Sequence, residues 1–223
     1  MANTRIPTPD EAFRLLLAGN QRFVTGEPEH PHQDASRRAS LVPGQNPFAV
    51  VFGCSDSRPA VELVFDRGLG DLFVVRNAGH VVGPEALGSI EYGVSLLGCP
   101  LVVVLGHSSC GAVAATRSAL AGGPPATGYV RDIVERVTPS VLAARAAGIE
   151  DPDAIVDEHI RNTVDLLLER SGALAGEVAA GRAAVVGLRY QLADGSARTV
   201  VARGLTDTGI LQDAGRPGAG VGE

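Results

Sequence analysis

Two short segments of the sequence gather the side chains that could perform chemistry. One reads Cys-Ser-Asp-Ser-Arg at residues 54–58, and the other reads His-Ser-Ser-Cys-Gly at residues 107–111. Two thiolates and one imidazole are ligands that zinc favours, and the ion binds such donors tetrahedrally. Three protein ligands leave the fourth position to water, whose pKa zinc lowers enough to supply hydroxide near neutral pH. We therefore predict one zinc ion held by Cys54, His107 and Cys110, in a site of the catalytic type.

A carboxylate and a guanidinium follow the first thiol at intervals of two residues, as Asp56 and Arg58. Zinc accepts a carboxylate oxygen, and the planar guanidinium of Arg58 suits a carboxylate. Either Asp56 fills the fourth position on the metal, or Arg58 holds Asp56 aside so that it accepts a hydrogen bond from the bound water. Higher pH favours the second state because hydroxide then competes better for the metal. A purely structural ion pair is the alternative, and it predicts little loss on mutation.

The elements that must position these segments follow from the apolar pattern. Continuous apolar runs at 48–52, 72–75 and 101–105 are typical of buried parallel strands. The two segments directly follow the first and third runs, at the carboxyl ends of strands, where open α/β sheets bind ligands. A fourth strand is expected over 183–192 and an antiparallel edge strand over 197–203, and helices over 84–97, 111–121, 129–146 and 153–170. The predicted fold class is α/β: a mainly parallel β-sheet flanked by helices, with an antiparallel edge strand.

The domain organisation is simple. The 223 residues suffice for one sizeable domain, which we expect over 1–205. Its N-terminal helical arm begins at the capping residue Thr8 and ends near Gly26, and an extended loop follows over 27–46. The glycine-rich tail, 206–223, is expected to be disordered.

Composition excludes several functions. Hydrophobic residues make up 45% and charged residues 20%, and the formal net charge is −6, so we expect no nucleic acid and no membrane as partner. An anion site must then be made locally positive, and Gly111, at an expected helix N-terminus, can donate its N–H to a developing anionic oxygen of a substrate. The start of the chain lacks the pattern of a secretory signal, and three cysteines do not suit a disulfide scaffold. We expect a cytoplasmic protein.

The two segments, together with Phe-Val-Val-Arg-Asn-Ala-Gly at 73–79, resemble the β-class carbonic anhydrases over about residues 8–205, the actinobacterial members above all. The resemblance implies zinc ligation by Cys54, His107 and Cys110, with Asp56 as fourth ligand in a closed state and as partner of Arg58 in an open one. It implies that Gln45 orients the carbon dioxide or bicarbonate and that Phe73, Ala78 and Tyr92 line the pocket, with Gln45 and Tyr92 crossing a dimer interface. It also implies a homodimer or homotetramer, with a sheet extended between subunits and the N-terminal helix packed on the partner. The family's regulatory bicarbonate site uses a tryptophan, which this chain lacks.

Other functions stay open on the sequence alone. Hydrolysis of carbonyl sulfide or carbon disulfide needs the same metal chemistry, and a non-catalytic zinc-binding scaffold needs the same ligands. A thiol redox protein using Cys54 and Cys110 is a third alternative.

We also consider the roles of four further side chains. We predict a structural role for Cys99 and a surface or interface position for His159. Arg76 is expected to make a salt bridge between elements or subunits rather than contact substrate. A part for His80 in proton transfer is left open.

Overall fold

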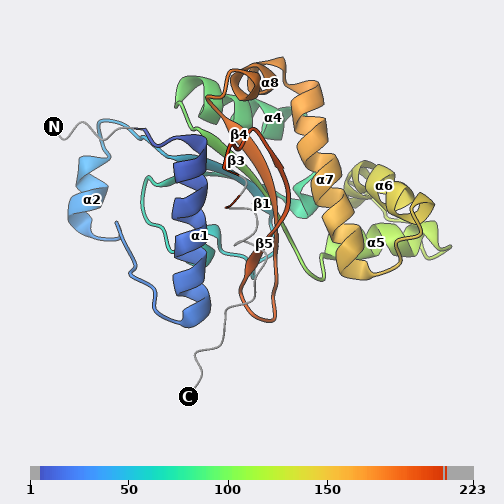
Figure 1. Cartoon of the computed structure of the whole chain (residues 1–223). Helices are drawn as coiled ribbons and strands as arrows, with labels where there is room; N and C mark the ends of the chain where they lie inside the picture. Colours follow the sequence, from blue (N-terminus) through green and yellow to red (C-terminus); the bar gives the residue numbers. More distant parts are fainter. Residues whose placement is uncertain (1–5, 208, 210–223) are drawn as a thin grey trace.

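The structure of the protein is a computed structural model, and it describes residues 6–207 and 209 of the chain. Its centre is one five-stranded sheet with the strand order β2-β1-β3-β4-β5 (Figure 1). The strands are β1 (Ala49–Cys54), β2 (Leu72–Asn77), β3 (Leu101–His107), β4 (Ala184–Tyr190) and β5 (Ala197–Arg203). The first four pair in parallel and β5 pairs antiparallel with β4. The predicted mainly parallel sheet with an antiparallel edge strand is therefore confirmed.

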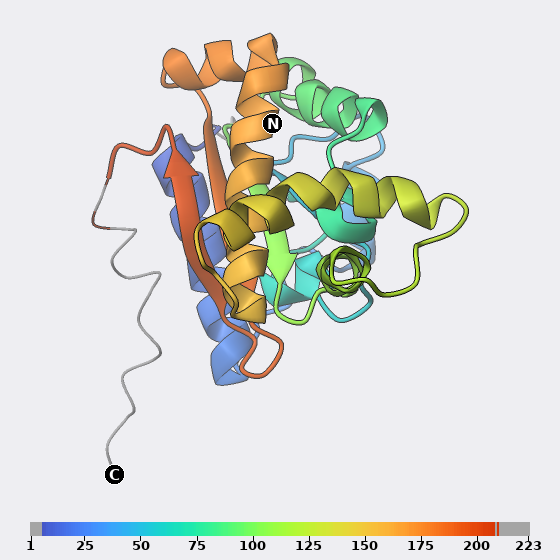
Figure 2. The same cartoon turned by 90° about the vertical axis from the view of Figure 1, so that its right-hand side faces the viewer.

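Helices cover both faces of this sheet (Figures 1 and 2). The larger core, on one face, joins the sheet to α4 (Pro84–Glu91), α5 (Gly111–Leu120), α6 (Val130–Ala146), α7 (Pro152–Arg170) and α8 (Gly172–Ala179). The smaller core, on the other face, joins it to α1 (Pro9–Thr25) and α3 (Val61–Val64). Because β1 and β3 lie between these layers, all their residues are buried. That burial explains why their sequences are continuously apolar rather than alternating.

The first helix has the predicted start. Thr8 caps α1 in a capping box with Glu11, and Gly26 ends the helix in the left-handed conformation. Its inner face belongs to the core of its own chain, where Phe13 and Leu16 are fully buried. Gly19 makes this possible, because a Cβ there would lie 1.9 Å from the carbonyl oxygen of Phe65. Only the outer face of α1 is left for a partner subunit.

Some elements were not expected from the sequence. The expected loop over 27–46 contains the short helix α2 (Ala35–Ser40), which Asp34 caps by accepting from the backbone of Arg37. The helix expected over 84–97 is α4 followed by a π-helical turn, η2 (Tyr92–Leu96). Short helices such as α2, α3 and α8 escape prediction because they depend on caps and packing more than on periodicity.

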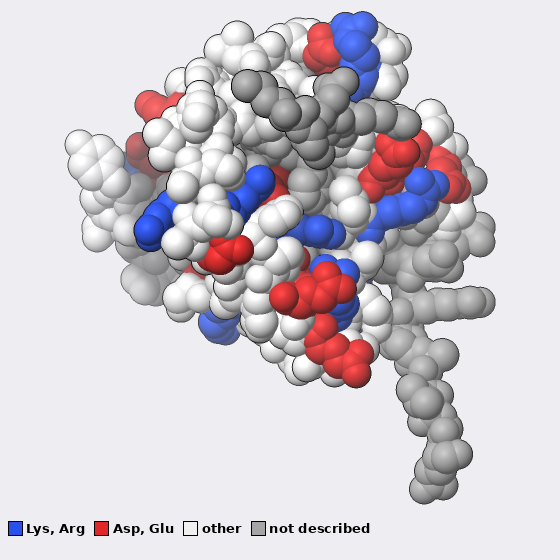
Figure 3. Space-filling view, turned by 90° about the vertical axis from the view of Figure 1, so that its left-hand side faces the viewer, with Lys and Arg blue, Asp and Glu red and all other residues white. Residues whose placement is uncertain are grey.

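The expected disorder of the tail falls mostly outside the described residues, which end with Asp207 and Gly209. Within them, Thr206 and Asp207 donate backbone hydrogen bonds to Asp10 of α1. Among residues 6–207, no helix is both long and apolar enough to cross a bilayer. Figure 3 shows acidic and basic side chains interspersed on the face that carries α1 and α2, without a continuous basic area among the residues drawn.

Candidate metal centre

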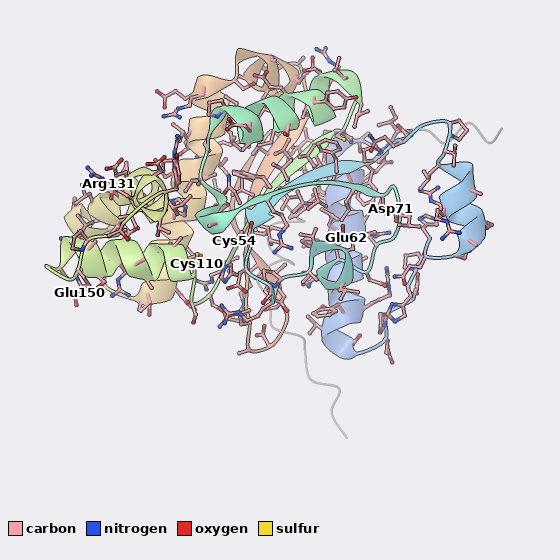
Figure 4. All side chains as sticks on the ribbon, turned by 180° about the vertical axis from the view of Figure 1, so that it is seen from behind. Cys54, Glu62, Asp71, Cys110, Arg131 and Glu150 are labelled. Atoms are coloured by element: carbon pink, nitrogen blue, oxygen red, sulfur yellow. The ribbon has the colours of Figure 1, made fainter. Side chains whose placement is uncertain are left out.

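Strand register brings the two chemistry-bearing segments together. β1 and β3 are parallel neighbours, with Gly53 opposite Leu105, so Cys54 and His107 both lie at the carboxyl edge of the sheet. Cys110 follows a tight turn in which Ser109 adopts a φ of 56°, and it forms the N-cap of α5. Figure 4 shows Cys54 and Cys110 close together at this edge. Two segments more than 50 residues apart therefore meet in one place, as the parallel topology requires.

The three predicted ligands form one buried cluster. The sulfurs of Cys54 and Cys110 and a ring nitrogen of His107 all lie within 4.8 Å of one another. His107 Nδ1 lies 2.9 Å from the carbonyl oxygen of Ser108, which can only accept, so Nδ1 carries the proton. His107 Nε2 is then unprotonated and carries a free lone pair. This nitrogen is buried without a hydrogen-bond partner in the described structure. A buried acceptor beside two thiols, with its tautomer fixed by the other nitrogen, fits a zinc ion.

The surroundings of Cys54 favour ionisation of its thiol. The pKa of Cys54 is lowered, first by its hydrogen bond with Cys110 and then by His107 and the N–H groups of Asp56 and Gly79, against the opposing effect of burial. The pKa of Cys110 is raised by its interaction with Cys54 and by burial. Cys54 therefore ionises first, because it receives more hydrogen bonds. A divalent ion removes the competition between the two thiols, since it binds both as thiolates.

Asp56 and Arg58 form a two-pronged ion pair. Arg58 donates from Nε to Oδ1 at 2.8 Å, from Nη2 to Oδ2 at 2.7 Å and from its backbone N–H to Oδ1 at 3.0 Å. These interactions, the side-chain hydrogen bond above all, hold the pKa of Asp56 well below its usual range. Asp56 Oδ2 also lies 3.9 Å from His107 Nε2. The carboxylate is thus held beside the cluster while Arg58 occupies both of its oxygens.

Within its own chain, Arg76 bonds to backbone oxygens instead of making the expected salt bridge between elements. It lies near the end of β2, and both its Nε and its Nη2 donate to the carbonyl oxygen of Cys54, at 2.8 and 2.6 Å. Its Nη2 also donates to the carbonyl oxygen of Asp56. No carboxylate within the described residues pairs with it. Arg76 therefore fastens the backbone of the first segment to the neighbouring strand.

A turn after β2 adds a contact to the cluster that sequence reasoning missed. Ala78, Gly79 and His80 form the turn η1 (Ala78–His80), and the N–H of Gly79 donates to Cys54 Sγ at 3.3 Å. Gly79 has a φ of 70°, and a Cβ there would lie 2.7 Å from the Cβ of Ala112. The run Asn-Ala-Gly indicates a turn here, but it does not reveal the contact with the sulfur. Ala78 is exposed at the start of it, and Gly111 is exposed at the N-terminus of α5, next to the cluster.

The structure does not bring Gln45 to the cluster of its own chain. Phe48 donates a hydrogen bond to Asp71, at the amino end of β2, whereas Cys54 lies at the carboxyl end of β1. Figure 4 shows Asp71 and Cys54 well apart along the strands. The six residues from Phe48 to Cys54 span about 20 Å, and the three from Gln45 to Phe48 extend at most about 10 Å. Gln45 therefore cannot reach its own metal cluster.

Phe73 and Tyr92 lie at the outer side of the sheet. Their rings stack with centroids 6.0 Å apart, and Phe73 pairs with Val50 near the amino ends of β2 and β1, whereas Cys54 lies at the carboxyl end of β1. Tyr92 is 46% exposed. Since β2 is an edge strand whose residues are at most half-buried, these two rings form part of an uncovered surface.

Cys99, His159 and His80 are the remaining side chains that the sequence analysis considered, and all three are buried. Cys99 is buried with its thiol 3.3 Å from the carbonyl oxygen of Pro47, and burial raises its pKa to about 12, in agreement with a structural role. The surface position predicted for His159 is wrong, since this side chain is only 2% exposed. His159 lies on the face of α7 that packs against η1. His80 is fully buried too, with its ring centroid 4.4 Å from that of His159.

A cavity of about 500 Å³ is lined in part by His159. Arg136, Asn162 and Arg170 are among its lining residues, and none of the three cluster residues lines it. This cavity is therefore separate from the chemistry described above.

A mainly parallel α/β sheet with a Cys-His-Cys group that could hold a metal ion at the carboxyl ends of its strands is the arrangement of a candidate metalloenzyme. The carbonic anhydrase family model matches residues 49–197. "Carbonic anhydrase 2" of Mycobacterium tuberculosis is 52% identical over 197 residues, 88% of this chain and 94% of that protein. "Carbonic anhydrase" of Mycolicibacterium smegmatis is 57% identical over 187 residues, 84% of this chain and 91% of that protein. This chain belongs to the β-carbonic anhydrase family.

Solved structures agree on the fold. A tetrameric β-carbonic anhydrase from Sordaria macrospora superposes with a TM-score of 0.68 at 22% identity, covering 85% of this chain and 98% of that one. The β-carbonic anhydrase of Coccomyxa, solved with acetazolamide, gives a TM-score of 0.65 at 25% identity, covering 74% and 77%.

Proposed function

We propose that this chain catalyses the reversible hydration of carbon dioxide to bicarbonate and a proton, with a zinc ion held by Cys54, His107 and Cys110. The observation that carries the proposal is the buried cluster itself, in which a fixed imidazole tautomer leaves Nε2 free beside two thiols. When bound there, zinc supplies the Lewis acidity that makes a water molecule nucleophilic at neutral pH, an effect known best from carbonic anhydrases.

The neighbouring side chains then have distinct tasks. Asp56 accepts a hydrogen bond from the nucleophile and orients it, and Arg58 keeps Asp56 in place through its two-pronged pair. The N–H of Gly111, at the positive end of α5, stabilises charge that develops on the oxygen of the substrate. Ala78, exposed beside the cluster at the start of η1, borders the substrate. Arg76 holds the backbone of Cys54, and the N–H of Gly79 holds its sulfur.

The site is completed by a second copy of the chain. Gln45 is exposed and too far from its own cluster, so a role in binding substrate requires that a partner subunit supply it. The surface that a partner would cover is present, because β2 is an open edge and Val42, Tyr92 and Leu96 are 84%, 46% and 70% exposed. We infer a homodimer or homotetramer in which Gln45, Phe73 and Tyr92 lie near the interface. The Sordaria protein is described as tetrameric. The three free cysteines suit a reducing compartment such as the cytoplasm.

The decisive experiment is stopped-flow carbon dioxide hydration as a function of pH, with metal content measured on the same sample. We expect activity proportional to zinc content and lost on chelation. Cys110→Ser should abolish both zinc binding and activity, whereas Cys99→Ser, which removes an equally buried thiol outside the cluster, should retain both. Full activity of the metal-free protein would overturn the proposal. Carbon disulfide, assayed in parallel, tests whether another heterocumulene is the better substrate.

A further inference from the structure

A chain of buried hydrogen bonds leads from α6 and α7 to the metal cluster. The Nε2 of His159 lies 2.8 Å from the carbonyl oxygen of Gly79, whose N–H donates to Cys54 Sγ. On the other side of the ring, Nδ1 lies 2.8 Å from Ser140 Oγ, and Asn162 Nδ2 donates to that same oxygen at 2.9 Å. His159 and Ser140 are both buried. The proposed catalytic steps use none of these three side chains.

The chemistry of the partners fixes one proton of His159. A carbonyl oxygen only accepts, so His159 must carry a proton on Nε2 and donate to Gly79. In the neutral ring Nδ1 accepts, so the hydroxyl of Ser140 donates to it, and the oxygen of Ser140 receives the N–H of Asn162. Burial lowers the pKa of His159, which agrees with a neutral ring at physiological pH.

Gly79, whose carbonyl oxygen accepts from His159, lies in a turn with a rarely adopted backbone conformation. Gly79 has a φ of 70° and the next residue, His80, a φ of 40°, a region that side-chain-bearing residues seldom adopt. The turn persists only if its surroundings hold it, and the bond from His159 to the carbonyl of Gly79 does so directly. The same turn aims the N–H of Gly79 at the sulfur.

We propose that His159, held by Ser140 and Asn162, is a positioning residue of the metal centre that fixes the Gly79 turn and thereby keeps its N–H on the Cys54 thiolate. This inference rests on the proposed metal centre. A hydrogen bond to a coordinated sulfur orients the ligand and tunes its donor strength, and partners of this kind commonly change metal affinity about 10- to 100-fold. His159 acts on the metal through Gly79 and does not touch the reacting atoms.

The test compares His159→Leu, which removes the donor, with His159→Gln, which can keep an N–H near the position of Nε2. Thr163→Val is the matched control, because it removes an equally buried hydroxyl one turn further along α7 that donates only to the backbone oxygen of residue 159. Zinc affinity is measured by competition with a chelator. The thiolate-to-metal charge-transfer band is measured after cobalt substitution.

We expect His159→Leu to weaken zinc binding about 10-fold or more and to move the charge-transfer band to lower energy, because a thiolate that has lost a hydrogen bond is a stronger electron donor. His159→Gln should lie between this variant and the wild type, and Thr163→Val should match the wild type. Unchanged zinc affinity and an unchanged band in His159→Leu would overturn the inference.

A second variant guards against misfolding of the first. Ser140→Ala removes the donor to Nδ1, which frees the ring to adopt the other tautomer and turn a lone pair toward the carbonyl of Gly79. It should change zinc affinity and the cobalt band in the same direction as His159→Leu, and wild-type values for both would count against the inference even if His159→Leu does not fold. Failure of the wild-type chain to bind zinc would instead refute the proposed function, so the two failures are distinguishable.

Discussion

The guanidinium of Arg58 occupies both carboxylate oxygens of Asp56, at 2.8 and 2.7 Å, while Asp56 Oδ2 stays 3.9 Å from the Nε2 of His107. If zinc binds as proposed, Arg58 and the metal would compete for the same carboxylate. The outcome of that competition would decide whether the fourth position at the metal is open to water. A merely structural ion pair needs no such closeness to a metal ligand.

The first prediction follows from that competition. Arg58→Met should lower carbon dioxide hydration near neutral pH about 10-fold or more, because the freed Asp56 moves onto the metal. Part of the activity should return at higher pH, where hydroxide competes better for the fourth position, while zinc content stays that of the wild type. Arg58→Lys keeps the charge without the fork and should fall between the two. A variant with the wild-type rate and pH profile would leave Asp56–Arg58 as a structural pair only.

The second prediction concerns Arg76. Arg76→Met strips the carbonyl oxygens of Cys54 and Asp56 of their donors, which should cost about 1–2 kcal/mol in the free energy of unfolding. It should also weaken zinc binding, since the first segment is no longer tied to β2. Urea unfolding and chelator competition measure the two effects.

A matched variant separates those effects. Arg22→Met breaks the ion pair between α1 and the buried Asp66, which involves none of the three cluster residues, so it should lower stability and leave zinc affinity unchanged. Equal zinc affinities for Arg76→Met and Arg22→Met would contradict the role assigned to Arg76.

The third prediction is a pH dependence of stability. His80 is fully buried, and neither of its ring nitrogens has a hydrogen-bond partner among the described residues. Burial, followed by the proximity of His159 and His107, holds its pKa well below 6.5. The unfolded chain therefore binds this proton first, so the stabilising contribution is present above about pH 6.5 and is lost as the pH falls below it.

Substitution isolates that contribution. His80→Leu in the metal-free protein should show a smaller loss of unfolding free energy between pH 7.5 and 5.5 than the wild type, as measured by urea unfolding. His159, His107 and the ring of Phe52 surround the side chain and are the same in both proteins. An identical loss in both would show that His80 does not titrate on unfolding.

The sequence predicted well that Cys54, His107 and Cys110 come together, because they lie at or just after the ends of strands that the apolar pattern locates. His159 was misplaced because Asp157, Glu158 and Arg161 make its surroundings look like a surface. Its spacing carried the better signal, since Val156, His159, Thr163 and Leu167 follow one another at three- and four-residue intervals and all are buried. The buried stripe of α7 is wide because this helix packs on the sheet, on α6 and on α8 at once.

The role of Arg76 could not have been predicted from composition. Its partners are the carbonyl oxygens of Cys54 and Asp56. Every residue has a backbone carbonyl, so the types of residue present do not indicate such a partner. The hydrogen bond from Gly79 to sulfur is hidden for the same reason. Contacts between side chains of complementary type, such as Asp56 with Arg58, are the ones that a sequence reveals.

The fourth prediction is that Gln45 acts across a subunit interface. Within one chain, the strand β1 separates it from the cluster, so a substrate-binding role and an isolated subunit are incompatible. Gln45→Ala should be poorly active and Cys110→Ser inactive when each is assayed alone. In an oligomer mixed from both, the zinc site of the Gln45→Ala subunit receives an intact Gln45 from its Cys110→Ser partner. Activity should therefore reappear when differently tagged copies are produced together and the mixed species is purified. If Gln45 acted within its own chain, every site in the mixture would carry a defect, and the mixed oligomer would be no more active than the average of its parents.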